Sequence, residues 1–194
     1  LTTGSELSAN FEKHLHEYDI TLKEHVSVKE ISETEEENYR IHLNTGETFE
    51  TRSIILATGA QWRKLGVPGE DENVGQGVAY CAHCDGPFFK GKDIAVVGGG
   101  NSGIEAALDL AGIVKHVTVL EFADDLKADQ VLINKAKEKS NIDIITSAAT
   151  QEIKAQDGKV TSLVYQDRSS SETKELDTSA VFVQIGLVPH TEFV

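Results

Sequence analysis

The sequence of 194 residues is 39% hydrophobic and 26% charged, a composition typical of a folded globular protein rather than a disordered one. Its formal net charge of -14 argues against nucleic-acid binding, which needs a basic surface. No apolar run approaches the roughly 20 residues of a membrane-spanning helix, so no membrane association is expected. The sequence contains no Met, and we therefore expect it to be part of a longer protein.

The first part of the chain is expected to hold one amphipathic helix and several short strands. A helix over residues 5–18 is predicted by the helical spacing of Leu7, Phe11, Leu15 and Tyr18. Strands are predicted over residues 20–22, 26–31, 39–43 and 47–50. A turn at residues 44–46 joins the last two strands into a hairpin. The apolar run over residues 53–57 predicts a buried strand that ends at Thr58.

The second part alternates between strands and helices. After a loop over residues 66–77, a new unit is predicted to start near Pro87. Its strands are expected at residues 94–97, 117–120, 142–145 and 180–185. Its helices are expected at residues 102–113 and 129–139, the second with Val131, Leu132 and Ala136 facing inward. Residues 153–176 suggest a small antiparallel excursion. This order predicts an α/β fold with a parallel sheet covered on both faces.

A glycine-rich corner lies between the strand at residues 94–97 and the helix that follows it. Gly98, Gly100 and Gly103 have the spacing of a dinucleotide-binding fingerprint. The first glycine makes a tight turn, the second lets the backbone approach a pyrophosphate, and the third lets helix and strand pack closely. Backbone N–H groups at the helix start bind phosphate. Gly99 belongs to the same corner. The side chains of Asn101 and Ser102 could add contacts to the phosphates.

An acidic residue follows the next strand, about 20 residues past the glycines. Glu121 is placed where a carboxylate accepts hydrogen bonds from the adenine-side ribose of a dinucleotide. A carboxylate there would repel a 2′-phosphate, and Lys127 is the only cation in the next turn. The sequence therefore favours NADH over NADPH. An ordinary surface acid at the end of a strand is the alternative.

The only two cysteines are Cys81 and Cys84, two residues apart. This spacing allows a small, reducible disulfide, and Asp85 could donate or accept the proton that dithiol chemistry needs. His83 could tune the thiolate or point to solvent. Half of a zinc site is a rival interpretation, but a structural zinc site wants four ligands and no second cysteine pair exists. So few cysteines suit a reducing cytosol, and redox chemistry is favoured over metal binding.

With these motifs in place, the sequence resembles the thioredoxin-reductase-type flavoproteins of the pyridine-nucleotide disulfide oxidoreductases. Among them it is most similar to the flavoprotein subunits of bacterial alkyl hydroperoxide reductases. The resemblance covers nearly the whole chain. It rests on the segments 81–87 and 94–103, and also on Ala57-Thr58-Gly59-Ala60, Val67-Pro68-Gly69-Glu70 and Gln184-Ile185-Gly186-Leu187-Val188-Pro189. Thioredoxin reductases carry a basic pair where this chain has Glu121-Phe122, a departure that favours the NADH-using flavoprotein.

The resemblance implies a path for electrons from NADH to FAD, then to the Cys81–Cys84 disulfide, and finally to a peroxiredoxin partner. It implies that Cys84 faces the flavin, that Cys81 attacks the next disulfide, and that Asp85 is the proton donor. The peroxiredoxin, which is the other component of an alkyl hydroperoxide reductase, would be reached through an N-terminal thioredoxin-like domain that this chain lacks. The parent protein is expected to be a cytoplasmic homodimer.

The resemblance also implies a domain organisation. Residues 1–86 are expected to form an incomplete FAD-binding domain with the dithiol at its end, and residues 87–194 an NAD-binding domain. The expected flavin contacts are Thr58, Gly59 and Ala60, and Gly186 is a further expected cofactor contact. Two flavin motifs of the family are missing, so we expect weak or no FAD binding and little turnover. The alternatives are an NADPH-dependent thioredoxin reductase, a non-catalytic NAD-binding module with structural cysteines, and a zinc-binding module.

Overall fold

A computed structural model describes residues 2–194, and its contacts divide them into two compact units. The first unit contains the residues up to Thr58 together with Thr191–Val194, and the second is Gly59–His190. Strand β5 (Val78–Ala79), just before Cys81, pairs inside the sheet of the second unit. No helix among residues 2–194 is long and apolar enough to cross a membrane.

The first unit consists of one helix and a three-stranded antiparallel sheet. Helix α1 (Gly4–Leu15) begins at a capping box, in which Thr3 and Glu6 bond each other's backbone N–H groups. The sheet has the order β1-β2-β3, formed by β1 (Val28–Glu33), β2 (Tyr39–Leu43) and β3 (Thr48–Thr51). The predicted helix and hairpin are thus confirmed, with Gly46 at positive φ in the hairpin turn.

Two strands predicted in the first unit do not form. Residues 20–22 and 53–57 are irregular, and Ile55 is 93% exposed. A buried strand needs neighbouring strands to satisfy its N–H and C=O groups. None of the described residues pairs with residues 53–57, so the prediction of a buried strand there is wrong.

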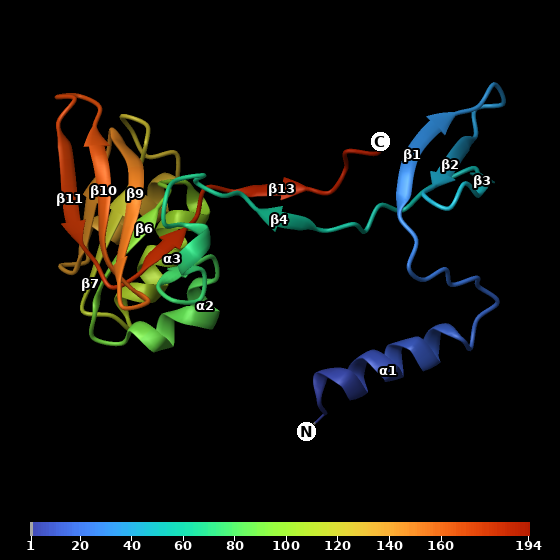
Figure 1. The fold of residues 1–194 in the computed structure, drawn as a ribbon, viewed down its shortest axis with the longest axis horizontal. Coiled ribbons are helices and arrows are strands. Elements are labelled where there is room, and N and C mark those ends of the chain that lie inside the picture. The colour runs from blue at the N-terminus through green and yellow to red at the C-terminus, as the bar shows by residue number, and fades with distance from the viewer. Residues whose placement is uncertain (1) are drawn as a thin grey trace. The chain divides into compact units, whose positions relative to one another are not determined.

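The second unit is built on a five-stranded parallel sheet, which confirms the predicted α/β fold (Figure 1). Its strand order is β5-β12-β6-β7-β8. The strands are β5 (Val78–Ala79), β6 (Asp93–Val97), β7 (His116–Leu120), β8 (Ile142–Ile145) and β12 (Val181–Val183). The edge strand β5 was not predicted, because two residues are too few to show a period.

Both faces of this sheet are buried, as the apolar run of β6 requires. Ile94 and Val96 pack with α3 (Asn101–Ala111) and α4 (Gln130–Lys137). Ala95 and Val97 face the other way, toward an antiparallel sheet of β9 (Ala148–Gln156), β10 (Lys159–Asp167) and β11 (Thr173–Asp177). Alternate residues of one strand therefore serve two separate cores.

The inward face of α4 differs from the prediction by one residue. Val131 is 63% exposed, while Ile133 and Ala136 are buried. Asp129 is the N-cap and the helix begins at Gln130. Positions 133 and 136, three residues apart, therefore lie on the same face of the helix, and this face packs on the sheet. Leu132 is partly buried, as expected.

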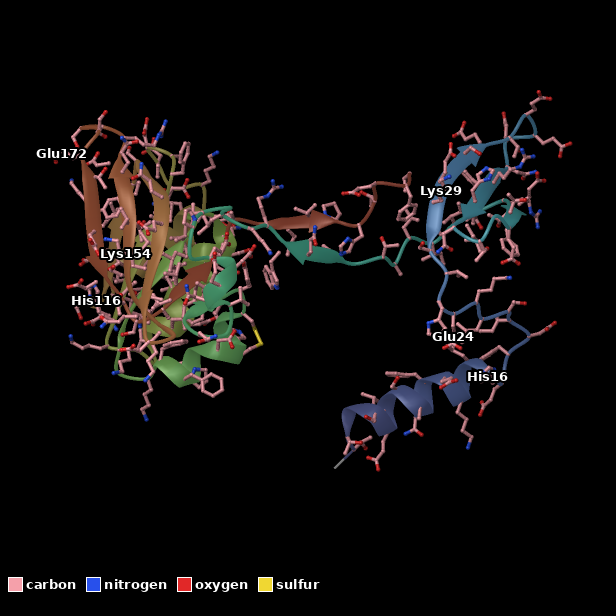
Figure 2. The ribbon with its side chains drawn as sticks, in the orientation of Figure 1. His16, Glu24, Lys29, His116, Lys154 and Glu172 are labelled. Carbon is pink, nitrogen blue, oxygen red and sulfur yellow. A yellow bond between two sulfur atoms is a disulfide. The ribbon has the colours of Figure 1, made fainter. Side chains whose placement is uncertain are left out.

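The remaining elements of the second unit are short. They are β4 (Ala60–Trp62), η1 (Asp71–Asn73), α2 (Ala82–Asp85), η2 (Gly86–Phe89) and β13 (Leu187–Pro189). Strands β4 and β13 pair antiparallel, a ladder that the sequence did not predict. On the antiparallel sheet, Lys154 of β9 forms an ion pair with Glu175 of β11 at 2.8 Å (Lys154 is labelled in Figure 2).

Candidate functional site: a dinucleotide corner and a disulfide

The glycine corner joins the carboxyl end of β6 to the start of α3. Gly98 has φ +120°, and a Cβ on it would lie 2.2 Å from the carbonyl oxygen of Gln184. A Cβ on Gly103 would lie 1.8 Å from the carbonyl oxygen of Gly98. Both positions thus need glycine. Gly98 needs it for the turn and for its close approach to the residue that follows β12, and Gly103 needs it for helix–strand packing.

Gly100 differs from these two glycines. It caps α3 without any side-chain hydrogen bond, and a Cβ built on it meets no atom within 4 Å. Its φ of −82° is open to any residue, so neither backbone strain nor packing requires a glycine here. The open space lies over the first turn of α3, whose N–H groups and dipole suit a phosphate group. The corner therefore fits a pyrophosphate.

Glu121 binds the glycine corner directly. Its Oε2 accepts a hydrogen bond from the N–H of Gly99 at 2.5 Å, and its Oε1 accepts one from the N–H of Ala123 at 2.8 Å. A carboxylate has further lone pairs beyond these two bonds, so it can still accept from a ribose hydroxyl. Glu121 thus has a structural role that the sequence did not reveal.

The side chains that follow the glycines contribute unequally. Asn101 exchanges two hydrogen bonds with Asp129, at 3.0 and 2.7 Å, and so joins the start of α3 to the start of α4. Ser102 is exposed and lines a pocket of about 280 Å³ that also borders Cys81. The first turn of α3 and the first cysteine of the disulfide therefore border the same pocket within one unit.

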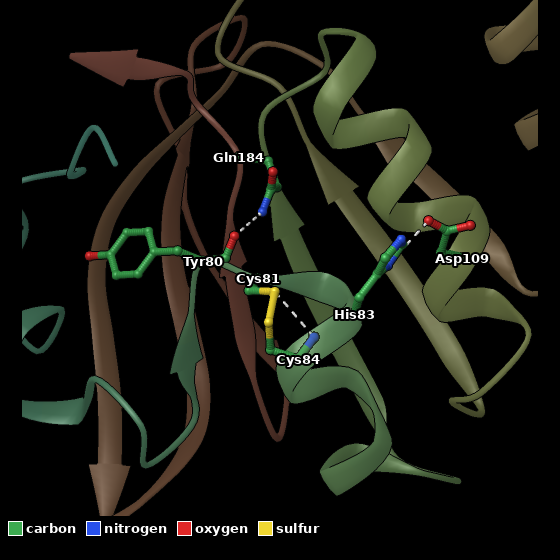
Figure 3. Close-up of a disulfide and its surroundings, with 6 residues drawn as sticks. All are labelled: Tyr80, Cys81, His83, Cys84, Asp109 and Gln184. Atoms are coloured by element: carbon green, nitrogen blue, oxygen red, sulfur yellow. Dashed lines mark hydrogen bonds and ion pairs between the residues drawn. A yellow bond between two sulfur atoms is a disulfide. The ribbon is translucent and has the colours of Figure 1, made fainter. Parts of the chain in front are cut away.

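Cys81 and Cys84 form a disulfide, as the redox interpretation predicts (Figure 3). Cys81 caps the short helix α2, and its Sγ accepts a hydrogen bond from the N–H of Cys84 at 3.2 Å. Asp85 ends the same helix and borders a second cavity of about 200 Å³. Because the two sulfur atoms bond each other, they offer no thiolate pair to zinc. No group of three metal-binding side chains occurs within residues 2–194.

His83 points away from the sulfur atoms. Its Nδ1 lies 3.6 Å from Oδ2 of Asp109 on α3, and both side chains are largely exposed (Figure 3). Such an exposed pair adds little stability. In the disulfide form, His83 therefore contacts α3 rather than the redox pair.

Tyr80, next to Cys81, is fixed at both ends. Its carbonyl accepts a hydrogen bond from Nε2 of Gln184 at 2.7 Å, and its hydroxyl donates to Glu70 at 3.0 Å. Glu70 is 1% exposed and also accepts from the N–H groups of Leu65 and Gly66, at 2.9 and 2.7 Å. Burial, and then the hydrogen bond to Glu70, raise the pKa of Tyr80 well above its ordinary value. The sequence motifs had drawn attention to Glu70, but nothing in them showed that it is buried and bonded to the hydroxyl of Tyr80.

The expected flavin contacts Thr58, Gly59, Ala60 and Gly186 are all exposed. Thr58 ends the first unit, while Gly59 and Ala60 begin the second. Gly59 has φ +69° with open space around it, and its carbonyl accepts from the N–H of His190 at 3.0 Å. Gly186 is also at positive φ, and its carbonyl accepts from the N–H of Arg63.

Comparison with known proteins gives a consistent set of relatives. Residues 37–194 match the family described as pyridine nucleotide-disulphide oxidoreductase. The F subunit of alkyl hydroperoxide reductase from Staphylococcus aureus (strain Mu50 / ATCC 700699) is 49% identical over 193 residues, which are 100% of this chain and 38% of that protein. A protein named NADH dehydrogenase from Ferdinandcohnia aciditolerans is also 49% identical, with 37% of its length covered. The chain thus spans less than half the length of these relatives.

Solved thioredoxin reductases share the fold. That of T. acidophilum has a TM-score of 0.75 and 36% identity, over 100% of this chain and 62% of that one. That of Lactococcus lactis, in the conformation called FR, has a TM-score of 0.76 and 36% identity, over 100% and 63%. The expected resemblance to the alkyl hydroperoxide reductase flavoprotein and to thioredoxin reductases is thereby confirmed. The chain belongs to the pyridine nucleotide-disulphide oxidoreductase family.

Proposed function

We propose that this chain is the NADH-binding, dithiol-bearing part of a flavin-dependent disulfide reductase. In the whole protein, two electrons would pass from NADH by way of FAD to the Cys81–Cys84 disulfide and then to a peroxiredoxin. The reaction class is NADH:peroxiredoxin disulfide oxidoreduction. The observation that carries this proposal is that one compact unit holds both an open dinucleotide corner and a disulfide, and that Ser102 at the start of α3 and Cys81 line one pocket.

The nucleotide would be held by backbone and side chain together. Gly100 leaves room for a pyrophosphate over the start of α3. Glu121, held by two N–H groups of its own chain, would accept hydrogen bonds from the adenine-side ribose. A fixed carboxylate beside the 2′-oxygen favours NADH over NADPH because it repels a 2′-phosphate.

The dithiol would complete the transfer. Reduction of the disulfide breaks the S–S bond, takes up two electrons and two protons, and yields two thiols. Asp85, at the end of the helix that carries Cys84, would supply one proton at the sulfur. Cys84 would face the flavin, while Cys81 would attack the partner's disulfide. Bound FAD supplies a two-electron relay between nicotinamide and disulfide.

The remaining assignments follow from the same proposal. Residues 1–86 and 87–194 would belong to the FAD-binding and NAD-binding domains, with Thr58, Gly59, Ala60 and Gly186 as flavin-side contacts. The partner would be the peroxiredoxin component of an alkyl hydroperoxide reductase, in the cytoplasm, and the parent protein a homodimer. Support comes from the 49% identity to the staphylococcal F subunit.

A second candidate is an NADPH-dependent thioredoxin reductase, which the solved relatives favour. Calorimetric titration of the chain with NADH and NADPH separates the two. The first proposal predicts tighter NADH binding and loss of this preference in Glu121→Gln, with Asp125→Asn, a nearby acid outside the corner, as the control. Tighter NADPH binding would support the second candidate, and failure to bind either nucleotide would refute both.

Thiol counting tests the redox half. We expect the disulfide to open and close reversibly in glutathione buffers of changing ratio, with two thiols per chain in the reduced form. Structural cysteines would resist reduction until the protein unfolds. That result would favour the non-catalytic NAD-binding module.

A further inference from the structure

The loop after β7 carries an exposed aromatic ring that is backed by an arginine. Phe122 follows Glu121 and is 61% exposed. The guanidinium carbon of Arg168 lies over this ring, 4.1 Å from its centroid. Arg168 comes from the turn between β10 and β11, 46 residues further along the chain. The sequence showed no arginine near Glu121, because this contact depends on the tertiary fold.

Three contacts hold the arginine behind the ring. Its Nη1 donates to the carbonyl oxygen of Phe122 at 2.8 Å and lies 3.6 Å from Oδ1 of Asp124. Its backbone N–H donates to the carbonyl of Ser147 at 2.7 Å, and Ser147 in turn bonds Asp124 and Ala123. These contacts hold the guanidinium over the Phe122 ring. One face is covered by the guanidinium, and the ring remains largely open to solvent.

We propose that the adenine ring of the dinucleotide stacks on the open face of Phe122, with Arg168 behind it. This inference rests on the proposed function and names the part of the site that binds the adenine. Glu121 and Phe122 are consecutive, so a nucleotide whose ribose reaches the carboxylate brings its purine to the neighbouring side chain. Aromatic rings stack well on purines, and an arginine on the opposite face adds a cation–π interaction.

The same contacts assign Arg168 a role other than phosphate recognition. Its charge is offset by Asp124 and its Nη1 is bonded to a carbonyl, so a 2′-phosphate would have to compete with both. Glu121 stands beside the ring and repels such a phosphate. Arg168 is a positioning residue that keeps the ring oriented. Its loss should weaken NADH and NADPH binding equally.

Calorimetry on the whole chain tests this inference with NADH, NADPH, ADP-ribose and reduced nicotinamide mononucleotide, which lacks the adenosine half. Phe122→Leu keeps an apolar side chain but removes the ring, and Phe122→Tyr restores a ring. We expect Phe122→Leu to raise Kd for NADH and ADP-ribose by about fivefold or more, since stacking contributes that much per base. Binding of the mononucleotide should stay unchanged, and Phe122→Tyr should bind like the parent chain. Arg168→Gln should weaken NADH and NADPH alike, by about two- to threefold.

The outcomes distinguish the inference from the function on which it rests. If the parent chain binds NADH and Phe122→Leu binds it equally well, the stacking inference is wrong and the proposed function stands. A loss in Arg168→Gln confined to NADPH would show that the arginine serves a 2′-phosphate, which also overturns the inference. If the parent chain binds no dinucleotide, the proposed function and the inference both fail.

Discussion

Alanine at two glycines of the same corner should have different effects: at position 103 it should lower stability, and at position 100 it should weaken NADH binding. At position 103 an added Cβ would lie 1.8 Å from the carbonyl oxygen of Gly98, whereas real Cβ contacts are essentially never under 3.0 Å. The backbone must therefore move by about 1 Å, and neither side can yield by a rotamer change. Overpacking costs about 1–3 kcal/mol, so we expect Gly103→Ala to lower the free energy of unfolding by about 3 kcal/mol.

Gly100→Ala is the matched comparison. Its φ of −82° suits alanine and the new Cβ meets nothing within 4 Å. The small loss from alanine at an N-cap is offset by reduced freedom of the unfolded chain, so stability should change by less than about 0.5 kcal/mol. The methyl group occupies the space left for the pyrophosphate, however, and Kd for NADH should rise at least about tenfold.

Urea denaturation and calorimetric NADH titration of the two variants measure both effects. The reasoning is refuted if Gly103→Ala is as stable as the parent chain. It is also refuted if Gly100→Ala binds NADH unchanged, because the space over the helix start would then not be the phosphate site.

Further predictions concern the buried carboxylate of Glu70, the pH dependence of stability and the retention of FAD. Glu70→Gln should cost about 2–3 kcal/mol in urea denaturation, because an amide cannot accept all three buried hydrogen bonds, whereas the exposed Asp71→Asn should cost under about 0.5 kcal/mol. Tyr80 has a raised pKa in the folded state, so the folded chain holds its proton more tightly than the unfolded chain. The contribution of Tyr80 to stability should be constant below about pH 10 and fall above it, and Tyr80→Phe should remove that part of the fall. A persistent decline in Tyr80→Phe would assign it to other groups. The chain should lose added FAD on dialysis, since Thr58 and Gly59 are exposed; a yellow protein that oxidises NADH steadily with a disulfide acceptor would contradict this.

The sequence predicted the parts of the fold that have a long local pattern. Strand β6, the glycine corner and α3 follow one another within a short stretch, and each has its own periodicity or turn signal. The edge strand β5 and the β4–β13 ladder have no such pattern, because two or three residues pair with partners about 100 or more positions away. Their existence is decided by the completed sheet.

The candidate site shows the same division. The spacing of Cys81 and Cys84 allowed a disulfide, and the lack of a second cysteine pair favoured redox chemistry over zinc. The contact of Arg168 with Phe122 could not be predicted, because it depends on how the β10–β11 turn folds back onto the loop after β7. Glu70 is similar: a lone acid in a loop looks solvated, and only the tertiary fold shows it to be buried under Tyr80.

The close fit of Gly98 and Gly103 has a consequence for coenzyme engineering. Every side chain larger than hydrogen at these two positions collides with a backbone carbonyl, so a change of nucleotide preference cannot be introduced there. Adaptation to another coenzyme would have to be made at Glu121 on the rim of the corner, and a replacement there would also have to accept the N–H groups of Gly99 and Ala123.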